Sequence, residues 1–417
     1  MNSRERILSA INHQEADRLP IDLGSMKSTG LSAISFNKLK KELNFSDPCL
    51  VYDFVQQLAF TGENLRERFH VDSMDVGEAF IGNLDENWKP WTLPDGSPCL
   101  IPNYVDARIL NEKGDIGVFD QSGIQLGVQP KGSLYVDQVY YPYGDLENIP
   151  EEVHFEDYRK TIWGVPTLPF NLDILNSPSD RELFTKTIKA YRKKTDKALM
   201  LCVGQSFFEN CGFIRRQEKF LMDIVLDKQG VIRLLNDLEE NYLQVLEVIV
   251  NSVGEDIDVF QFGGDDLGSQ HELMISPRTV RELLIPHYRK VWKFVHERSK
   301  AKVFLHSCGS IRRVLGDLVE AGLDIINPVQ TTAARMDPQE LKDEFGKDLV
   351  FWGGGCDTQH ILPNGTVQEV EEDVKRRIDI FAPGGGFVFS QIHNIQANVP
   401  TENIQAMFRT AYEYGKY

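Results

Sequence analysis

The sequence lacks the dense cysteine framework of a small secreted domain. Its 417 residues contain only 6 cysteines, which are scattered along the chain. We therefore expect reduced thiols, which can bind a metal. The amphipathic first segment, MNSRERILSAINHQEADRLP, is also not followed by the long apolar core of a signal peptide. A cytoplasmic location is the resulting expectation.

Basic residues are also fewer than acidic residues, with 45 Lys and Arg against 62 Asp and Glu. The formal net charge is −17, which would repel nucleic acid and anionic membrane surfaces, so neither is an expected partner. No glycine-rich loop leads into a helix, because Gly384, Gly385 and Gly386 precede an apolar, strand-like run. Hydrophobic residues are 41% of the chain and charged residues 26%, which is the composition of a globular protein.

Short apolar runs alternate with long amphipathic segments after about residue 180. The runs are ALMLCVG, DVFQFGGDD, KVFLHSCGS, DIINPVQ, LVFWGGGCD and GFVFSQIHN. The segments between them have helical spacing, and they include residues 228–253, 276–299, 311–323, 337–346 and 367–383. This alternation predicts an α/β protein with a parallel sheet buried on both faces. We expect the sheet to close into a (β/α)8 TIM barrel.

Two regions lie outside this rhythm. The first sixty or so residues are expected to form a helical lead-in, whose clearest helix is SDPCLVYDFVQQLAFTGENLRERF, residues 46–69. Residues 88–143 carry glycine-containing turns between short β-branched and aromatic runs, which predicts a small antiparallel β-rich insertion. We expect one barrel domain over residues 1–417 that contains this insertion.

Three strand-end residues form a predicted metal site. His306 and Cys308 are two positions apart at the end of an apolar run, so their side chains are expected to point the same way. Cys356 ends another run, where Gly354 and Gly355 would let the backbone approach a bound cofactor. Imidazole with thiolate suits Zn²⁺, and three protein ligands leave one position open. The alternative is that each is an ordinary buried residue.

Further polar residues end neighbouring runs. Asp265 and Asp266 are candidate catalytic groups, as a fourth zinc ligand, a partner of His306 or a proton donor. The alternative is that one of them caps a helix. His393, as a catalytic group, and Asn394, as a cofactor-binding group, end the last run. A polar pair there is expected to face a ligand, or else to close the barrel structurally.

Longer blocks carry a resemblance to a known family. ADRLPIDLGSMKSTGLS, GGDDLGSQHELMISP and APGGGFVFSQIHNIQANVPTENI resemble the uroporphyrinogen decarboxylase superfamily, and the resemblance runs from Arg18 to the C-terminus. Within it the chain is similar to the methyltransferase branch that works with corrinoid proteins. That branch has a His-x-Cys zinc motif followed by a Cys, on which His306, Cys308 and Cys356 fall. The resemblance implies Zn²⁺ and a corrinoid (cobalamin) carried by a partner protein.

The expected function is methyl transfer between a small methylated compound, or a thiol or folate acceptor, and this corrinoid. A decarboxylase and a non-catalytic tetrapyrrole- or corrinoid-binding protein are the alternatives. Decarboxylases of the family bind the carboxylates of their substrate with an arginine-rich R-Q-A-G-R segment. The corresponding stretch of this chain has only Lys27 as a cation. The expected partners are a corrinoid-binding protein and the small substrate or methyl acceptor, and a homodimer stays an open option.

Overall fold

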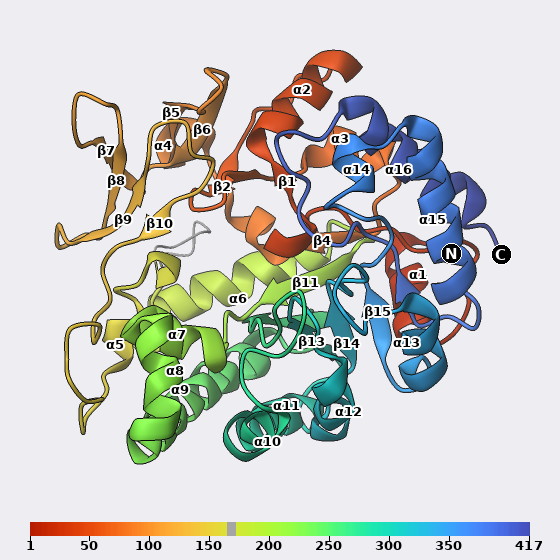
Figure 1. Ribbon diagram of the computed structural model, residues 1–417. Helices are drawn as coiled ribbons and strands as arrows, with labels where there is room; N and C mark the ends of the chain where they lie inside the picture. The colour runs from red at the N-terminus through yellow and green to blue at the C-terminus, as the bar shows by residue number, and fades with distance from the viewer. Residues whose placement is uncertain (165–171) are drawn as a thin grey trace.

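A curled sheet of parallel strands forms the centre of the molecule (Figure 1). The computed structural model describes residues 1–164 and 172–417. Within them the sheet has 7 strands in the order β16-β15-β14-β13-β12-β11-β4. Along the chain these are β4 (Ser73–Asp75), β11 (Ala198–Cys202), β12 (Val259–Gly264), β13 (Lys302–His306), β14 (Ile325–Asn327), β15 (Val350–Trp352) and β16 (Phe387–Val388). The predicted α/β class is thus confirmed.

Alternate strand residues form an apolar interior on one face of the sheet. This buried cluster contains Met200, Val259, Phe304, Ile325 and Trp352, together with residues of α1 (Ser3–Ile11). The side chains two positions further along each strand lie on the same face, nearer its carboxyl end. The interior is therefore apolar in the middle, and polar residues are placed at the carboxyl edge.

Residues 20–22 connect the two edge strands of the sheet. Phe389, just after β16, donates its backbone N–H to Pro20 (2.9 Å), and Asp22 donates to the Phe389 carbonyl (2.8 Å). Asp72, just before β4, donates to the Ile21 carbonyl (2.7 Å). The expected (β/α)8 barrel would need an eighth strand. Among the described residues, 20–22 instead form a hydrogen-bonded segment with a single bridge, so the sheet has 7 strands.

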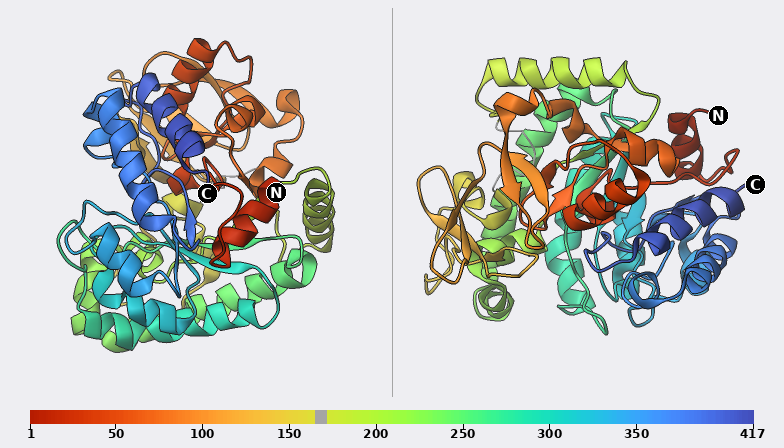
Figure 2. Two further views of the ribbon diagram at one scale, coloured as in Figure 1. Left: turned by 90° about the vertical axis from the view of Figure 1, so that its right-hand side faces the viewer. Right: turned by 90° about the horizontal axis from the view of Figure 1, so that it is seen from above.

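Helices cover the outer face of the sheet (Figure 2). The long helix predicted over residues 228–253 has these bounds in the structure, and its buried residues recur every three to four positions. The helices are α1, α2 (Ala33–Leu43), α3 (Gly62–Arg68), α4 (Leu84–Asn87), α5 (Phe155–Tyr158), α6 (Pro178–Arg192), α7 (Phe208–Arg215), α8 (Gln217–Leu226), α9 (Lys228–Val253), α10 (Pro277–Thr279), α11 (Ile285–His296), α12 (Arg312–Ala321), α13 (Pro338–Phe345), α14 (Ile361–Asn364), α15 (Val367–Phe381) and α16 (Thr401–Tyr414). No helix among the described residues has both the length and the apolar character needed to cross a membrane.

The helix predicted over residues 46–69 is wrong for most of its length. The structure instead contains β2 (Val51–Asp53), a turn, β3 (Leu58–Ala59) and then α3, and β3 also pairs with β1 (Leu31–Ser32). The Asp53 carboxylate accepts the backbone N–H groups of Val55 (2.9 Å) and Gln56 (3.0 Å), which stabilises the turn. Such local bonds compete with helix formation.

The region between Trp88 and Tyr143 is built from antiparallel strands, which lie to one side of the central sheet (Figure 1). They are β5 (Trp88–Thr92), β6 (Pro98–Pro102), β7 (Asp106–Ile109), β8 (Ile116–Phe119), β9 (Gln125–Gln129) and β10 (Asp137–Gln138). We call residues 88–143 the β-rich segment. Its contacts with the rest of the molecule include the backbone bonds from Val136 to Val55 (3.0 Å) and from Leu100 to Cys49 (2.8 Å).

Candidate metal centre

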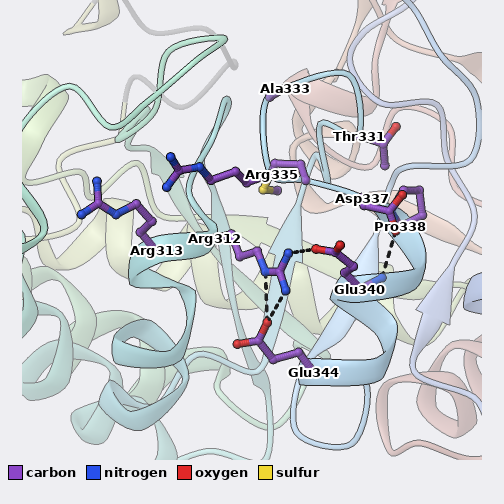
Figure 3. A pocket seen from close by; sticks show the side chains of 10 residues that line it. Arg312, Arg313, Thr331, Ala333, Arg335, Asp337, Pro338, Glu340 and Glu344 are labelled. Atoms are coloured by element: carbon purple, nitrogen blue, oxygen red, sulfur yellow. Dashed lines mark hydrogen bonds and ion pairs between the residues drawn. The ribbon is translucent and has the colours of Figure 1, made fainter.

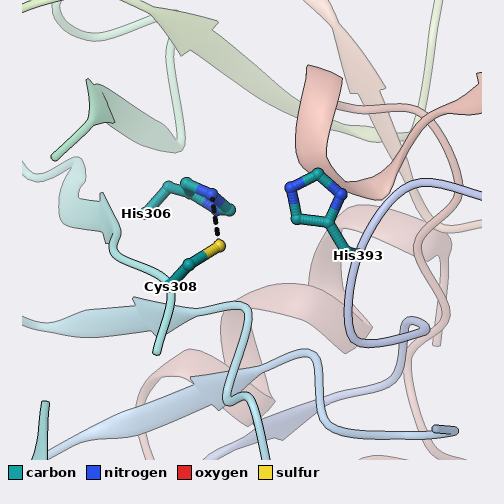
Figure 4. Close-up of side chains that lie close together, drawn as sticks. All are labelled: His306, Cys308 and His393. Carbon is teal, nitrogen blue, oxygen red and sulfur yellow. Dashed lines mark hydrogen bonds between the residues drawn. The ribbon is translucent and has the colours of Figure 1, made fainter. Parts of the chain in front are cut away.

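Three side chains with metal-binding atoms meet at the carboxyl edge of the sheet. They are His306, Cys308 and His393, and one ligand atom from each lies within 4.8 Å of the others. His306 is the last residue of β13, and Cys308 follows two positions later, with its Sγ 3.3 Å from His306 Nε2. His393 comes from the loop after β16 and faces the pair from the other side (Figure 4). We call these three residues the metal-site triad.

Asn327 holds the ring of His306. The two residues are direct partners in the parallel register of β13 and β14. Asn327 Nδ2 donates to the Trp352 carbonyl (2.7 Å), so its Oδ1 is turned toward His306 Nδ1 at 2.5 Å. Ser28 Oγ donates to the same Oδ1 (2.8 Å). An amide oxygen only accepts, so Nδ1 carries the proton and Nε2 presents a lone pair toward Cys308.

Acidic side chains surround Cys308. The Asp266 carboxylate accepts the Cys308 backbone N–H (2.8 Å) and lies 3.7 Å from His306 Nε2. Burial raises the pKa of the Cys308 thiol, and the charges of Asp266 and Glu209 raise it further. A nearby cation would offset both effects, because it favours the thiolate. Asp266 therefore lies where a partner of His306 was expected.

Glu209, near the start of α7, was not identified from the sequence. Its carboxylate accepts a hydrogen bond from the backbone of Asp266 and, like His306, lies close to Gly264 at the end of β12. Burial raises the pKa of Glu209 well above its usual range, with further contributions from Asp266 and Asp265. The sequence signal for Glu209 is its position a few residues beyond the apolar run 198–204.

His393 and Asn394 lie together, and Asn394 contacts the histidine directly. His393 Nδ1 is 2.9 Å from Asn394 Oδ1, and the Asn394 side chain is almost completely buried. Burial lowers the pKa of His393 to about 4, with a contribution from His306, so the ring is neutral at neutral pH. The predicted polar pair therefore lies at the site, with His393 nearest the other potential ligands.

Cys356, the predicted third ligand, is not part of this group. It is fully buried after β15, and burial raises the pKa of its thiol. The carboxylates of Asp373, on α15, and Asp357 raise this pKa further, which places the thiol toward the helical layer. The spacing that suggested Cys356 located the correct edge of the sheet but did not specify the direction of the side chain. In the structure His393 takes the third position.

Gly354 and Gly355 allow close packing of protein against protein. A Cβ at Gly355 would lie 2.5 Å from the Phe389 ring and 2.7 Å from the Ser390 carbonyl. A Cβ at Gly354, where φ is +71°, would lie 3.2 Å from Val329. The close approach expected for a bound cofactor is thus made by neighbouring chain segments.

Asp265 acts as a cap for α7. Its buried carboxylate accepts the backbone N–H groups of Phe207 (2.8 Å), Phe208 (2.7 Å) and Glu209 (2.8 Å), and it also bonds the Tyr288 hydroxyl. Burial raises the pKa of Asp265 to about 6. These four bonds correspond to the capping alternative for the aspartate pair, while Asp266 is the member that reaches the metal-site triad.

An open hollow of about 740 Å³ lies at the start of α12, close in sequence to Cys308 (Figure 3). Its arginines are paired: Arg312 bonds Glu340 and Glu344, and Arg335 lies 3.0 Å from Glu272. Its lining residues are Arg312, Arg313, Thr331, Ala333, Arg335, Met336, Asp337, Pro338, Glu340 and Glu344. No predicted site residue lines it, and its paired charges do not favour a ligand of one sign.

The comparisons with known proteins agree with this fold. The family model URO-D, uroporphyrinogen decarboxylase, matches residues 167–414, which is more than half of the chain. The chain therefore belongs to the uroporphyrinogen decarboxylase family, as the sequence blocks indicated. No curated protein matches it.

Among solved structures, a methyltransferase from Methanosarcina mazei has a TM-score of 0.58 at 15% identity, and the match covers 99% of each chain. This likeness shows a shared fold. A GH113 beta-1,4-mannanase matches at a TM-score of 0.37 and 10% identity over 94% of this chain and 99% of that one. A hyperthermophilic beta-glucosidase from Pyrococcus furiosus matches at a TM-score of 0.36 and 8% identity over 84% and 82%. The latter two are too distant to carry an argument.

Proposed function

We propose that this protein is a zinc-dependent methyltransferase. It moves a methyl group between a small methylated compound, or a thiol or folate acceptor, and a corrinoid carried by a partner protein. The observation that carries the proposal is the metal-site triad at the carboxyl edge of a sheet from the uroporphyrinogen decarboxylase family. The fold shared with the Methanosarcina mazei methyltransferase supports it.

The chemistry of the donor set fits zinc. Two imidazoles and one thiolate are typical zinc ligands, whereas Mg²⁺ and Ca²⁺ prefer oxygen. Tetrahedral zinc bonds of about 2.0–2.3 Å place ligand atoms about 3.3–3.8 Å apart. Cys308 Sγ and His306 Nε2 already have such a separation at 3.3 Å, and the ligand atoms of the whole triad, which lie within 4.8 Å of one another, would have to move slightly closer around the ion. Three protein ligands would leave a position for a substrate atom, as in catalytic zinc sites.

Neighbouring residues orient the ligand atoms of His306 and Cys308. Asn327 fixes the proton of His306 on Nδ1 and leaves Nε2 available. The Cys308 backbone N–H bonds Asp266, which orders the loop that carries the thiol. When bound, zinc would act as a Lewis acid toward the heteroatom of a methyl donor, or would lower the pKa of a thiol acceptor. His306 is buried, whereas Cys308 and His393 are partly exposed, which leaves the same position open to an incoming substrate.

The corrinoid belongs to the partner in this proposal. It is supported by the resemblance of the sequence blocks to the corrinoid-dependent branch, and no residue of this chain is assigned to hold it. A partner that brings the corrinoid would have to dock at the carboxyl edge, because His306 lies at that edge. The net charge of −17 favours a docking surface on the partner that is not strongly acidic.

A decarboxylase is the second candidate, and Asp75 favours it. This carboxyl ends β4 at the same edge of the sheet, and burial raises its pKa to about 7. Such a group exchanges protons readily near neutral pH. Lys27, however, is the only cation in the stretch that corresponds to the arginine-rich segment of the family decarboxylases, and it is paired with Asp53 at 3.3 Å. This stretch therefore has no equivalent of the arginines that bind the substrate in those enzymes.

The two candidates are separated by activity of the purified, zinc-loaded protein. We expect a change in the cobalamin spectrum with one member of a panel of phenyl methyl ethers, methylamines, betaines and thiols, and loss of that change on zinc chelation. Cys308→Ser should abolish the change, whereas Cys356→Ser should preserve it. An unchanged spectrum across the panel, together with carboxylate loss from uroporphyrinogen, would replace the methyltransferase with the decarboxylase.

A further inference from the structure

A chain of hydrogen-bonded polar side chains begins at the Asp53 carboxylate, at the end of β2. Gln56 donates its Nε2 to Asp53 Oδ2 (3.2 Å), and its backbone N–H bonds the other oxygen (3.0 Å). Lys27 lies 3.3 Å from the same carboxylate, which is completely buried. Because Asp53 takes the amide nitrogen of Gln56, the Gln56 oxygen is directed away from Asp53.

The next two contacts continue this direction. Gln56 Oε1 accepts Asn394 Nδ2 (3.1 Å), so Asn394 presents its Oδ1 to His393 Nδ1 at 2.9 Å. Since Oδ1 can only accept, His393 must donate from Nδ1. The lone pair of the neutral ring is then on Nε2.

The β-rich segment reaches the same amide by a second route. Tyr135, between β9 and β10, donates its hydroxyl to Gln396 Oε1, and Gln396 Nε2 donates to Asn394 Oδ1. Both routes place the Asn394 oxygen toward His393. The two sets of hydrogen bonds therefore require the same orientation of the Asn394 side-chain amide. The arrangement parallels Asn327, whose oxygen faces Nδ1 of His306.

We propose that Asp53, Gln56 and Asn394 form a positioning relay that fixes the proton of His393 on Nδ1 and leaves Nε2 to bind the metal. The inference deepens the proposed function and rests on its zinc site. Asp53 and Gln56 lie more than 330 positions before His393 in the sequence. The relay would therefore give β2, β3 and the turn between them a role at the metal site. Tyr135 gives the β-rich segment a part in the same task.

The test compares Gln56→Leu with a matched control, Gln205→Leu. Gln205 is also buried and donates one bond, to the Tyr242 carbonyl (3.1 Å), but it lies outside the relay. Nitrogen-15 NMR of labelled histidine in the metal-free protein, at about pH 8 where imidazole is neutral, reports which nitrogen of His393 is protonated. We expect Nδ1 in the wild type and the control, and a mixture of both forms in Gln56→Leu.

Zinc affinity provides the second readout, by competition with a chromophoric chelator. Gln56→Leu should bind zinc about tenfold more weakly, and Gln205→Leu within about twofold of wild type. Protonation of wild-type His393 at Nε2, or an unchanged proton position and affinity in Gln56→Leu, would overturn the relay. A wild-type protein with His393 protonated at Nδ1 that binds no zinc would contradict the proposed function while supporting the fixed proton. Thermal unfolding of both metal-free variants verifies that they fold.

Discussion

Cys308 and Cys356 are the residues that best separate two possible ligand sets. Cys308 Sγ lies 3.3 Å from His306 Nε2, whereas the Cys356 thiol is associated with Asp373 and Asp357. We predict that Cys308→Ser weakens zinc binding by more than about 100-fold, because a hydroxyl is a poor substitute for a thiolate. Cys356→Ser should leave zinc affinity within about twofold of wild type. Chelator competition measures both, and the reverse ranking would restore the ligand set expected from the sequence.

Asp75 makes a pH-dependent contribution to stability. Burial raises its pKa to about 7, compared with about 3.9 in an unfolded chain. Between these values the folded state binds more protons than the unfolded state, so this carboxyl lowers the free energy of unfolding as pH rises. We predict that wild type loses stability relative to Asp75→Asn from pH 5 to pH 7, with no further change above about pH 8.

Urea unfolding of both proteins across this range measures the difference. Asparagine keeps an oxygen that can accept the Gly77 N–H, as Asp75 Oδ1 does at 2.6 Å, but it does not titrate. Parallel stability curves for the two proteins would show that Asp75 is ionised throughout in the folded state.

The sequence predicted His306, Cys308 and His393 as site residues because each ends or follows an apolar run, and the structure brings their side chains together. It did not identify Asn327 and Glu209. Asn327 is a neighbour of His306 only through the register of β13 and β14, and Glu209 approaches Gly264 only because α7 is held there. Strand-end position shows which edge of a sheet a residue occupies, whereas side-chain direction depends on packing in three dimensions.

At the scale of elements, α7 depends on a cap from another part of the chain. Asp265 accepts three backbone N–H groups at the helix start, and its bond to Tyr288 adds α11 to the contact. We predict that Asp265→Ala lowers the free energy of unfolding by about 3 kcal/mol, because several buried donors lose a charged acceptor. Urea unfolding measures the change.

A matched comparison is Asp227→Ala at the start of α9. Asp227 caps its helix through a single bond to the Gly230 N–H (2.9 Å). Its removal should cost about 1 kcal/mol, the usual value for one cap. Equal losses in the two variants would mean that the additional bonds of Asp265 contribute nothing.

Helices with a clear apolar face were predictable, as the agreement over residues 228–253 shows. The failure at residues 46–69 has a physical origin. Asp53, Gln56 and Gln57 have the spacing of the polar face of a helix. In the structure nearly every side chain between Leu50 and Phe60 is buried, so this spacing does not mark a solvent-exposed face. The Asp53 turn and the pairing of β3 with β1 then decide the structure, and the latter depends on a distant segment.

At the scale of the whole molecule, the sheet and its helices form the core without help from the metal-site triad. The interior cluster around Phe304 and Trp352 is apolar, and neither residue belongs to the triad. We predict that the zinc-free protein remains folded and unfolds cooperatively. Zinc at about 100 times its dissociation constant should add about 2.7 kcal/mol to the free energy of unfolding, by binding the folded state.

Calorimetry with and without a chelator tests this prediction. A zinc-free protein that has lost its near-ultraviolet circular dichroism would instead indicate a structural metal, on which folding depends. Cys308→Ser provides the control, since added zinc should leave its unfolding temperature almost unchanged.

The hydrogen bonds that residues 20–22 make to Phe389 and Asp72 join segments that are synthesised at different times. A ribosome delivers residues 20–22 well before Phe389, their partner beside β16. Leu19 likewise donates to the carbonyl of Gly415 (2.6 Å), close to the other terminus (Figure 2). Until Phe389 is made, the nascent chain therefore carries an unpaired sheet edge, and such an edge is exposed to wrong partners.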